Sequence, residues 1–380
     1  MNALSTPDAV VFGLVLAARL LVPLLIPRFP LPAVLAAMVI DGVDGGIFSS
    51  FTSIDMGFYQ SYDKALDVYY LAIAYLAVRR NWPGRFPVAL LAGLWYYRLV
   101  GVLAFELTGA RWLLMVFPNT FEYAFIALEV ARTRWSPVRL SRRALVLTVA
   151  TIWIVVKLPQ EWWIHVAQLD FTDEFTRVTS TWPWTWAVIA ALVAALGVLA
   201  RWGLPRLPRP DWSVTLDADV VAERTGWRPV REVGPRGSMW NLALVEKLVF
   251  AALLTAILAE VYPGVSAPVS RVVLVVGLVV LATAALDVTR RLVRASLPTW
   301  ARALVAFALT AAALVVFADL VAGRRGALGW VDALVFAYVI TLVASLYDVF
   351  ELRRLRRAGS VEVRSDVPSG AARTPAGAPG

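Results

Sequence analysis

Apolar stretches long enough to cross a lipid bilayer recur along most of this chain. A helix needs about 20 predominantly apolar residues to span the hydrocarbon core. The sequence predicts about eleven such spans, at 9–26, 31–48, 63–78, 86–107, 112–131, 144–164, 183–201, 241–261, 271–289, 299–320 and 328–350. Apolar residues make up 59% of the chain and charged residues only 17%, which does not suit a water-soluble domain. We therefore expect an all-α, polytopic transmembrane helix bundle in the cell membrane.

The arginines are distributed unevenly between the loops. Most of them fall in alternate loops, at 79–85, 132–143, 201–236, 290–302 and 353–357. Loops rich in Arg and Lys stay on the cytoplasmic side of a membrane. This pattern predicts that the N-terminus lies outside and the C-terminus inside. It also explains the net charge of +9 by contact with anionic membrane lipids, and we expect no nucleic-acid partner.

One long loop divides the predicted spans into two groups. Residues 202–240 are rich in Pro, Gly and charge, and they read as a cytoplasmic linker or a small cap. The predicted organisation is a seven-span part at 1–201, this linker, a four-span part at 241–350, and a tail at 351–380. The tail is basic at first and then has the composition of a disordered segment.

Two residue counts limit the cofactors that the chain can hold. Cysteine is absent, and His165 is the only histidine in the sequence. These counts exclude disulfides, thiolate nucleophiles, iron–sulfur clusters and a multi-histidine or Cys-ligated zinc site. No haem or nucleotide cofactor is indicated by a motif either. A metal ion in this chain would be held by carboxylates, which suits Mg²⁺ or Mn²⁺.

Four aspartates lie near the facing ends of the second and third predicted spans. Asp41 and Asp44 are three residues apart at the end of one helix, so they share a face. Asp63 and Asp67 are four residues apart at the start of the next helix and also share a face. A connection over residues 49–62 allows the four carboxylates to converge. We therefore regard all four as candidate metal ligands.

Clustered carboxylates repel one another, so they persist only where protons, a cation or basic side chains compensate them. Lys64 and Arg98 are candidate partners, and a divalent cation would compensate the charge more completely. In the alternative interpretation the aspartates lie in the aqueous interface. Three glycines then mark the end of the helix, at Gly42, Gly45 and Gly46.

The spacing of these aspartates resembles the motif of the CDP-alcohol phosphotransferases. That motif is D-x2-D-G-x2-A-R, followed by eight or nine residues and then G-x3-D-x3-D. Residues 41–67 contain Asp41-x2-Asp44-Gly45 and Asp63-x3-Asp67 at the family's separation, with Phe48-Ser49 in place of Ala-Arg and Tyr59 in place of Gly. The resemblance implies a metal held by these carboxylates beside a phosphate. The family's site faces the cytoplasm, whereas the arginine pattern places these aspartates on the outer side.

The sixth predicted span carries a second group of polar residues. Lys157, Glu161 and His165 follow one another at intervals of four residues, so on a regular α-helix they form one stripe. Lys157 and Glu161 can neutralise each other, and His165 titrates near neutral pH. Pro159 is expected to kink the helix and free a carbonyl group. We regard the stripe as a candidate for acid–base catalysis, and a structural ion pair is the alternative.

Weaker candidates flank these two groups. Arg98 can bind a phosphate or carboxylate through two hydrogen bonds, although a structural pair with Glu106 or Asp67 also explains it. Together with Arg98, the candidate substrate-binding residues are Asn119, Glu122 and Lys64. The predicted topology places the aspartates, Glu122, Glu161 and His165 in the same outer half of the membrane, which favours one shared cavity.

Three functional hypotheses follow from these residues. The first is a divalent-metal-dependent transferase that acts on a lipid- or polyprenyl-phosphate-linked substrate in cell-envelope biosynthesis, with His165 or Glu161 as the base. The second is a proton-coupled secondary transporter that uses Lys157, Glu161 and His165. The third is a non-catalytic scaffold for envelope assembly.

Overall fold

The computed structural model describes residues 6–53, 59–166, 208–225 and 242–261, with short helical stretches between 180 and 201, 274 and 281, 304 and 312, and 338 and 348. In this part of the chain the regular structure is entirely helical, which confirms the predicted fold class. The longer helices are α1 (Thr6–Leu21), α2 (Pro30–Phe51), α3 (Tyr59–Asn81), α4 (Arg85–Thr108), α6 (Thr120–Arg132), α7 (Arg142–Thr151) and α12 (Leu242–Val261). The shorter ones are η1 (Val22–Leu25), α5 (Trp112–Val116), η3 (Pro137–Arg139), η4 (Ile152–Lys157), α8 (Leu158–Glu161), η5 (Trp162–Val166) and α11 (Ala218–Arg224).

Five helical segments are long and apolar enough to cross a membrane. They are Pro7–Leu25, Pro30–Phe51, Arg85–Thr108, Trp112–Arg132 and Arg142–Glu161. Each coincides with a span predicted from the sequence. Many of their large apolar side chains are exposed, as expected for helices that face lipid. The eleven spans and their orientation remain predictions.

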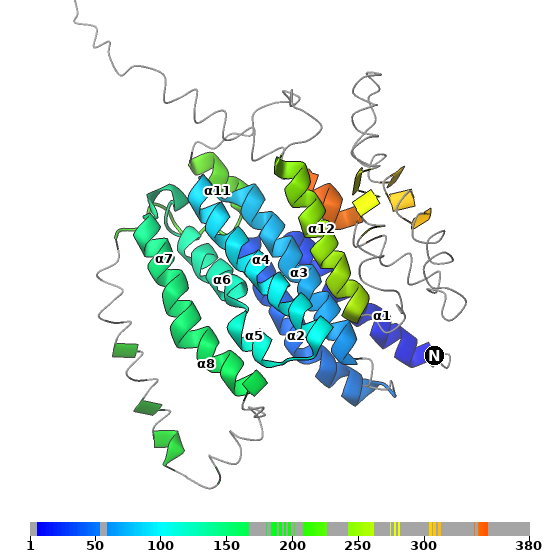
Figure 1. The fold of residues 1–380 in the computed structure, drawn as a ribbon. Coiled ribbons are helices and arrows are strands. Elements are labelled where there is room, and N and C mark those ends of the chain that lie inside the picture. Colours follow the sequence, from blue (N-terminus) through cyan, green and yellow to red (C-terminus); the bar gives the residue numbers. More distant parts are fainter. Residues whose placement is uncertain are drawn as a thin grey trace, which may run out of the picture.

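Helix α3 lies at the centre of the bundle and packs against α1, α2, α4, α6, α11 and α12 (Figure 1). Every residue from Val68 to Trp82 is buried. Because other helices cover α3, its outer surface does not have to be apolar as that of a lipid-facing helix does. Charged residues can therefore lie near both of its ends. The third predicted span is therefore a helix, but protein surrounds it.

Helix α2 continues beyond the glycines that were candidates for its end. It runs without a break to Phe51, so Asp41 and Asp44 lie in its interior. Since α3 begins at Tyr59, the connection is shorter than the predicted 49–62. The prediction of a helix end near Asp44 was wrong, because backbone groups within a membrane must bond internally, and this requirement outweighs the low helix propensity of glycine.

The predicted fifth span is broken in its middle. Helix α5 ends at Val116 and α6 begins at Thr120, so residues 117–119 form an irregular turn around Pro118. Two side chains of α4 hold this turn: Tyr97 Oη donates a hydrogen bond to the Val116 carbonyl (2.7 Å), and the Arg98 guanidinium donates one to the Phe117 carbonyl (3.0 Å). These donors replace backbone bonds that the break removes.

The predicted sixth span departs from regular α-helical geometry. The segments η4 and η5, on either side of α8, are π-helical. Leu158 N bonds to the Trp153 carbonyl, five residues earlier, and Pro159 follows immediately. Because a π-helical turn contains more residues than an α-helical one, the regular α-helical spacing assumed for Lys157, Glu161 and His165 does not extend through η4 and η5. Whether the His165 side chain shares a face with the other two stays a prediction, since it lies outside the described residues.

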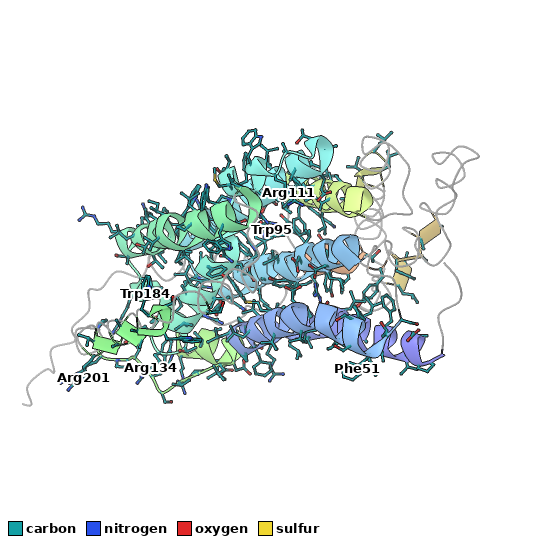
Figure 2. The ribbon with its side chains drawn as sticks, turned by 90° about the horizontal axis from the view of Figure 1, so that it is seen from below. Phe51, Trp95, Arg111, Arg134, Trp184 and Arg201 are labelled. Atoms are coloured by element: carbon teal, nitrogen blue, oxygen red, sulfur yellow. The ribbon has the colours of Figure 1, made fainter. Side chains whose placement is uncertain are left out.

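A small folded cap covers one end of the bundle. Residues 208–225, which include α11, belong to the long loop between the predicted halves, and they lie against the turns that precede α2 and α7 (Figure 1). Ala218 N donates to the Arg28 carbonyl (2.8 Å), and Thr215 N donates to the Thr133 carbonyl (2.9 Å). In Figure 2, Arg134 lies toward this end of the bundle and Phe51 toward the other.

Helix α12 packs against α3 and α4 in the same apolar core. Its side chains Phe250, Leu254 and Ile257 are almost completely buried. Most residues of the predicted spans 183–201, 271–289, 299–320 and 328–350 lie outside the described part of the chain, as does the tail 351–380.

Candidate functional site

Arg19 brings together all four aspartates of the predicted acidic cluster. It lies near the C-terminal end of α1, and its guanidinium is almost completely buried, with 3% of the side chain exposed. One of its nitrogens lies 2.6 Å from a carboxylate oxygen of Asp41 and 2.6 Å from one of Asp44. The distances to carboxylate oxygens of Asp63 and Asp67 are both 3.3 Å. Side chains from α1, α2 and α3 therefore meet at one guanidinium.

The four carboxylates differ in their exposure. Asp44 is fully buried, and its ion pair with Arg19 marks it as a structural partner. Asp41, Asp63 and Asp67 have 28%, 31% and 39% of their side chains exposed. Each of these three offers one carboxylate oxygen, and the three oxygens lie within 4.8 Å of one another. This arrangement has the donor chemistry that Mg²⁺ and Mn²⁺ prefer.

The charge within the cluster is not balanced by Arg19 alone. Among the described side chains one guanidinium faces four carboxylates, and clustered carboxylates repel one another. Protons or a bound cation would compensate the remainder. The residues present therefore fit a carboxylate-held metal ion.

Arg19 was absent from the candidates derived from the sequence. Lys64 and Arg98 were the candidate partners instead. The available signal was the position of Arg19 itself, since it is the only basic residue of an otherwise apolar helix. A charge at that depth in a membrane helix indicates a partner on a neighbouring helix.

A second polar group begins one turn beyond the acidic cluster on α3. Tyr70, three residues after Asp67 and on the same face, donates a hydrogen bond to Glu122 Oε1. The other oxygen of Glu122 accepts a hydrogen bond from Asn119 Nδ2 at 2.7 Å. Glu122 is buried, so both contacts hold a carboxylate that is shielded from bulk water. Asn119 and Glu122, both candidate substrate-binding residues, thus contact each other.

The break between α5 and α6 joins this group to the predicted sixth span. Asn119 N donates a hydrogen bond to Glu161 Oε1 at 3.2 Å. The same oxygen of Glu161 lies 3.3 Å from Lys157 Nζ, and both side chains are buried. Lys157 also lies over the ring of Tyr123, 4.4 Å from its centroid. The ion pair between Lys157 and Glu161 is therefore present. It is connected to the rest of the bundle by the backbone N–H of Asn119, in the turn between α5 and α6.

The remaining candidates are placed as follows. Arg98 donates to the Phe117 carbonyl and so supports the helix break beside Asn119. The backbone of His165 lies in η5, while its side chain and that of Lys64 lie outside the described part of the structure. The structure thus joins Asn119, Glu122 and Glu161 in one network, and it gives Arg98 a backbone partner.

Taken together, the contacts form a polar path through the bundle. It runs from Arg19 and the aspartates along α3 to Tyr70, and then through Glu122 and Asn119 to Glu161 and Lys157. Buried ionisable groups are costly among membrane helices and usually mark a functional site. Chemically, the path combines oxygen ligands for a cation at one end with a buried acid–base pair at the other.

The helices and their buried polar path define a helical membrane protein. No family model matches the chain, and neither a curated protein nor a solved structure matches it. The function is therefore inferred from the site alone.

Proposed function

We propose that the chain is an integral-membrane transferase that depends on a divalent cation and acts on a lipid- or polyprenyl-phosphate-linked substrate. The observation that carries this proposal is the convergence of Asp41, Asp63 and Asp67, whose oxygens lie within 4.8 Å of one another and remain partly exposed. Carboxylates in this arrangement can hold Mg²⁺ or Mn²⁺. When bound, such an ion supplies a Lewis acid for a phosphate group.

The protein's own residues have distinct roles in this proposal. Asp41, Asp63 and Asp67 bind the cation, while Asp44 fixes the guanidinium of Arg19. Arg19, from α1, holds the carboxylates of α2 and α3 in place. The resemblance of residues 41–67 to the CDP-alcohol phosphotransferase motif supports the same assignment of the aspartates.

We place the acceptor beside Glu122 and Asn119, between the cation site and Glu161, so that its hydroxyl can reach both the donor and the base. The bond between the sugar and the polyprenyl phosphate breaks, and the phosphate leaves with its charge compensated at the cation site. Glu161 accepts a proton from an acceptor hydroxyl, and its contact with Lys157 fixes the position of its carboxylate. His165 follows Glu161 by four residues and is the second candidate for the base. Asn119 and Glu122 orient the acceptor, since both already take part in the same hydrogen-bond network.

The setting of the reaction follows from the arginine pattern. We place the arginine-rich end and the cap in the cytoplasm and the aspartates toward the outer side of a multi-pass protein in the cell membrane. An outward site without an ATP motif suits a polyprenyl-phosphate-linked donor, as used in cell-envelope biosynthesis. This choice of donor rests on an analogy with membrane glycosyltransferases that have many transmembrane spans.

The test is conversion of a labelled polyprenyl-phosphate-linked sugar by the purified full-length protein, with Mg²⁺ or Mn²⁺ and with a chelator. We expect Asp63→Asn and Asp67→Asn to lower the rate by at least about a hundredfold, since each removes a charged metal ligand. Glu223→Gln, an exposed acid on the cap, is the matched control and is expected to leave the rate unchanged. Full activity of both aspartate variants would contradict the proposal.

A proton-coupled transporter is the second candidate, and the buried Lys157–Glu161 pair favours it. Buried carboxylates joined through Asn119 can pass a proton between them. This function predicts solute flux in proteoliposomes that follows a pH gradient, needs no divalent cation and is abolished in Glu161→Gln. Flux that is indifferent to the pH gradient would exclude it.

A further inference from the structure

The turn between α6 and α7 carries several exposed arginines at the boundary of two membrane-length segments. Trp112–Arg132 ends just before it, and Arg142–Glu161 begins just after it. The exposed side chains are Arg134, Arg139, Arg142 and Arg143. Arginines within a few residues of a membrane helix lie at the level of the lipid headgroups.

Two of these arginines begin α7, whose next turn has exposed apolar side chains. The guanidinium of Arg142 also lies over the ring of Phe86, 5.4 Å from its centroid. Arg142 precedes Val146 by four residues, and Arg143 precedes Leu147 by four, so each pair shares one face of α7. Val146 and Leu147 are 46% and 66% exposed, as is usual for side chains in contact with acyl chains. Ile154 and Val155 of η4, the segment that follows α7, are exposed as well. A cationic group above an apolar strip matches a phospholipid, which carries its phosphate above its acyl chains.

A third arginine of the turn is shared with the cap. Arg139 forms an ion pair with Asp211, although 72% of its side chain is exposed. Asp211 also accepts a hydrogen bond from Ser136 N (2.8 Å), and its own N–H donates to the Arg134 carbonyl (2.9 Å). A carboxylate of the cap is therefore bound to an exposed arginine of the turn.

We propose that the α6–α7 turn is a binding surface for anionic phospholipid headgroups, and that Asp211 of the cap competes with the lipid for Arg139. Arg142 and Arg143 bind the phosphate, and the acyl chains lie along Val146 and Leu147. A leaflet rich in anionic lipid consequently loosens the contact between the cap and the turn. This role is separate from the transferase chemistry, because the turn and the aspartate cluster involve different parts of the bundle.

Lipid binding is tested on the full-length protein in neutral detergent by native mass spectrometry, with phosphatidylglycerol and phosphatidylcholine added in turn. We expect phosphatidylglycerol to be retained preferentially, and the Arg142→Gln/Arg143→Gln double variant to bind it more weakly by about fivefold for each arginine removed. Arg224→Gln, an exposed arginine of α11 on the cap that does not adjoin a membrane-length segment, is the matched control and should bind as the unaltered protein does. Equal retention of both lipids, or displacement of the lipid by inorganic phosphate at equal concentration, would overturn the proposal.

The competition is tested by the distance between two spin labels, introduced at Val138→Cys on the turn and Ser213→Cys on the cap. The chain has no native cysteine to interfere. In nanodiscs, replacing phosphatidylcholine with phosphatidylglycerol should lengthen or broaden the distance distribution. Asp211→Asn should broaden it already in phosphatidylcholine and should strengthen retention of phosphatidylglycerol. A distribution that is unchanged between the two lipids would overturn the competition.

Discussion

Arg19 shows how a single buried charge can hold three helices together. Its guanidinium comes from α1, while its partners come from α2 and α3. Breaking a buried ion pair by removing one partner is strongly destabilising, because the other charge is left uncompensated. Asp44 is the most sensitive partner, since none of its side chain is exposed.

We expect Arg19→Gln to lower the free energy of unfolding by about 3–5 kcal/mol. Thermal unfolding of the purified protein in detergent measures the loss. Adding Asp44→Asn to the same chain should restore part of the stability, because it removes a fully buried carboxylate that has lost its ion pair with Arg19. The exposed Arg111→Gln serves as the control. An unchanged melting temperature in Arg19→Gln would show that the guanidinium does not hold the cluster.

The convergence of the aspartates was predictable, but their partner was not. Helical periodicity places Asp41 with Asp44 and Asp63 with Asp67 on shared faces, and consecutive helices usually pack together. Arg19 precedes Asp41 by more than twenty residues, so only packing of α1 against both other helices brings it close. Sequence spacing carries no information about that packing.

At the scale of helices, the interruptions of the fifth and sixth spans position the second polar group. The turn around Pro118 frees Asn119 N to bind Glu161, and the π-helical turns beside α8 position Lys157 and Glu161. Hydropathy predicts where these spans lie but not where they break, since an apolar stretch interrupted by one proline still reads as one span. Pro118 and Pro159 were the available signals.

The close approach of α4 to the broken helix depends on Gly101. A Cβ atom at this position would lie 2.1 Å from Phe117 Cβ, in the turn between α5 and α6. We expect Gly101→Ala to destabilise the protein by about 1–3 kcal/mol through overpacking. Gly93→Ala on the same helix meets nothing within 4 Å and should be neutral or slightly stabilising. The melting temperatures of the two variants are compared by thermal unfolding. Equal melting temperatures would mean that Phe117 and the turn move aside without loss of stability.

At the scale of the whole molecule, helices from the two predicted halves share one core. Phe250 of α12 lies beside Tyr75 and Trp95, with ring centroids 5.5 and 6.4 Å away. Glu246 accepts hydrogen bonds from Tyr75 and Arg79, and Arg79 also lies over the ring of Tyr347. The predicted boundary at 202–240 was based on composition, which marks a long polar loop but does not reveal whether the helices on either side pack together.

This packing predicts that the two halves stay together after the chain is cut. A protease site introduced within 226–241 should give two fragments that copurify in mild detergent. Phe250→Ala should weaken the association, because it removes a large buried ring from the shared core. Size-exclusion chromatography of the cleaved protein measures both results. Separation of the unaltered fragments would show that the shared core is too weak to hold them.

The position of Arg19 also has a consequence for biogenesis. During synthesis, α1 reaches the bilayer before any of the aspartates that neutralise its arginine. Releasing α1 alone would strand a cation in hydrocarbon, at a cost of about 2.5–3.5 kcal/mol for a central arginine on the insertion scale. We therefore expect the first helix to stay beside the insertion machinery until α2 and α3 have emerged, so that the three enter the lipid as one unit.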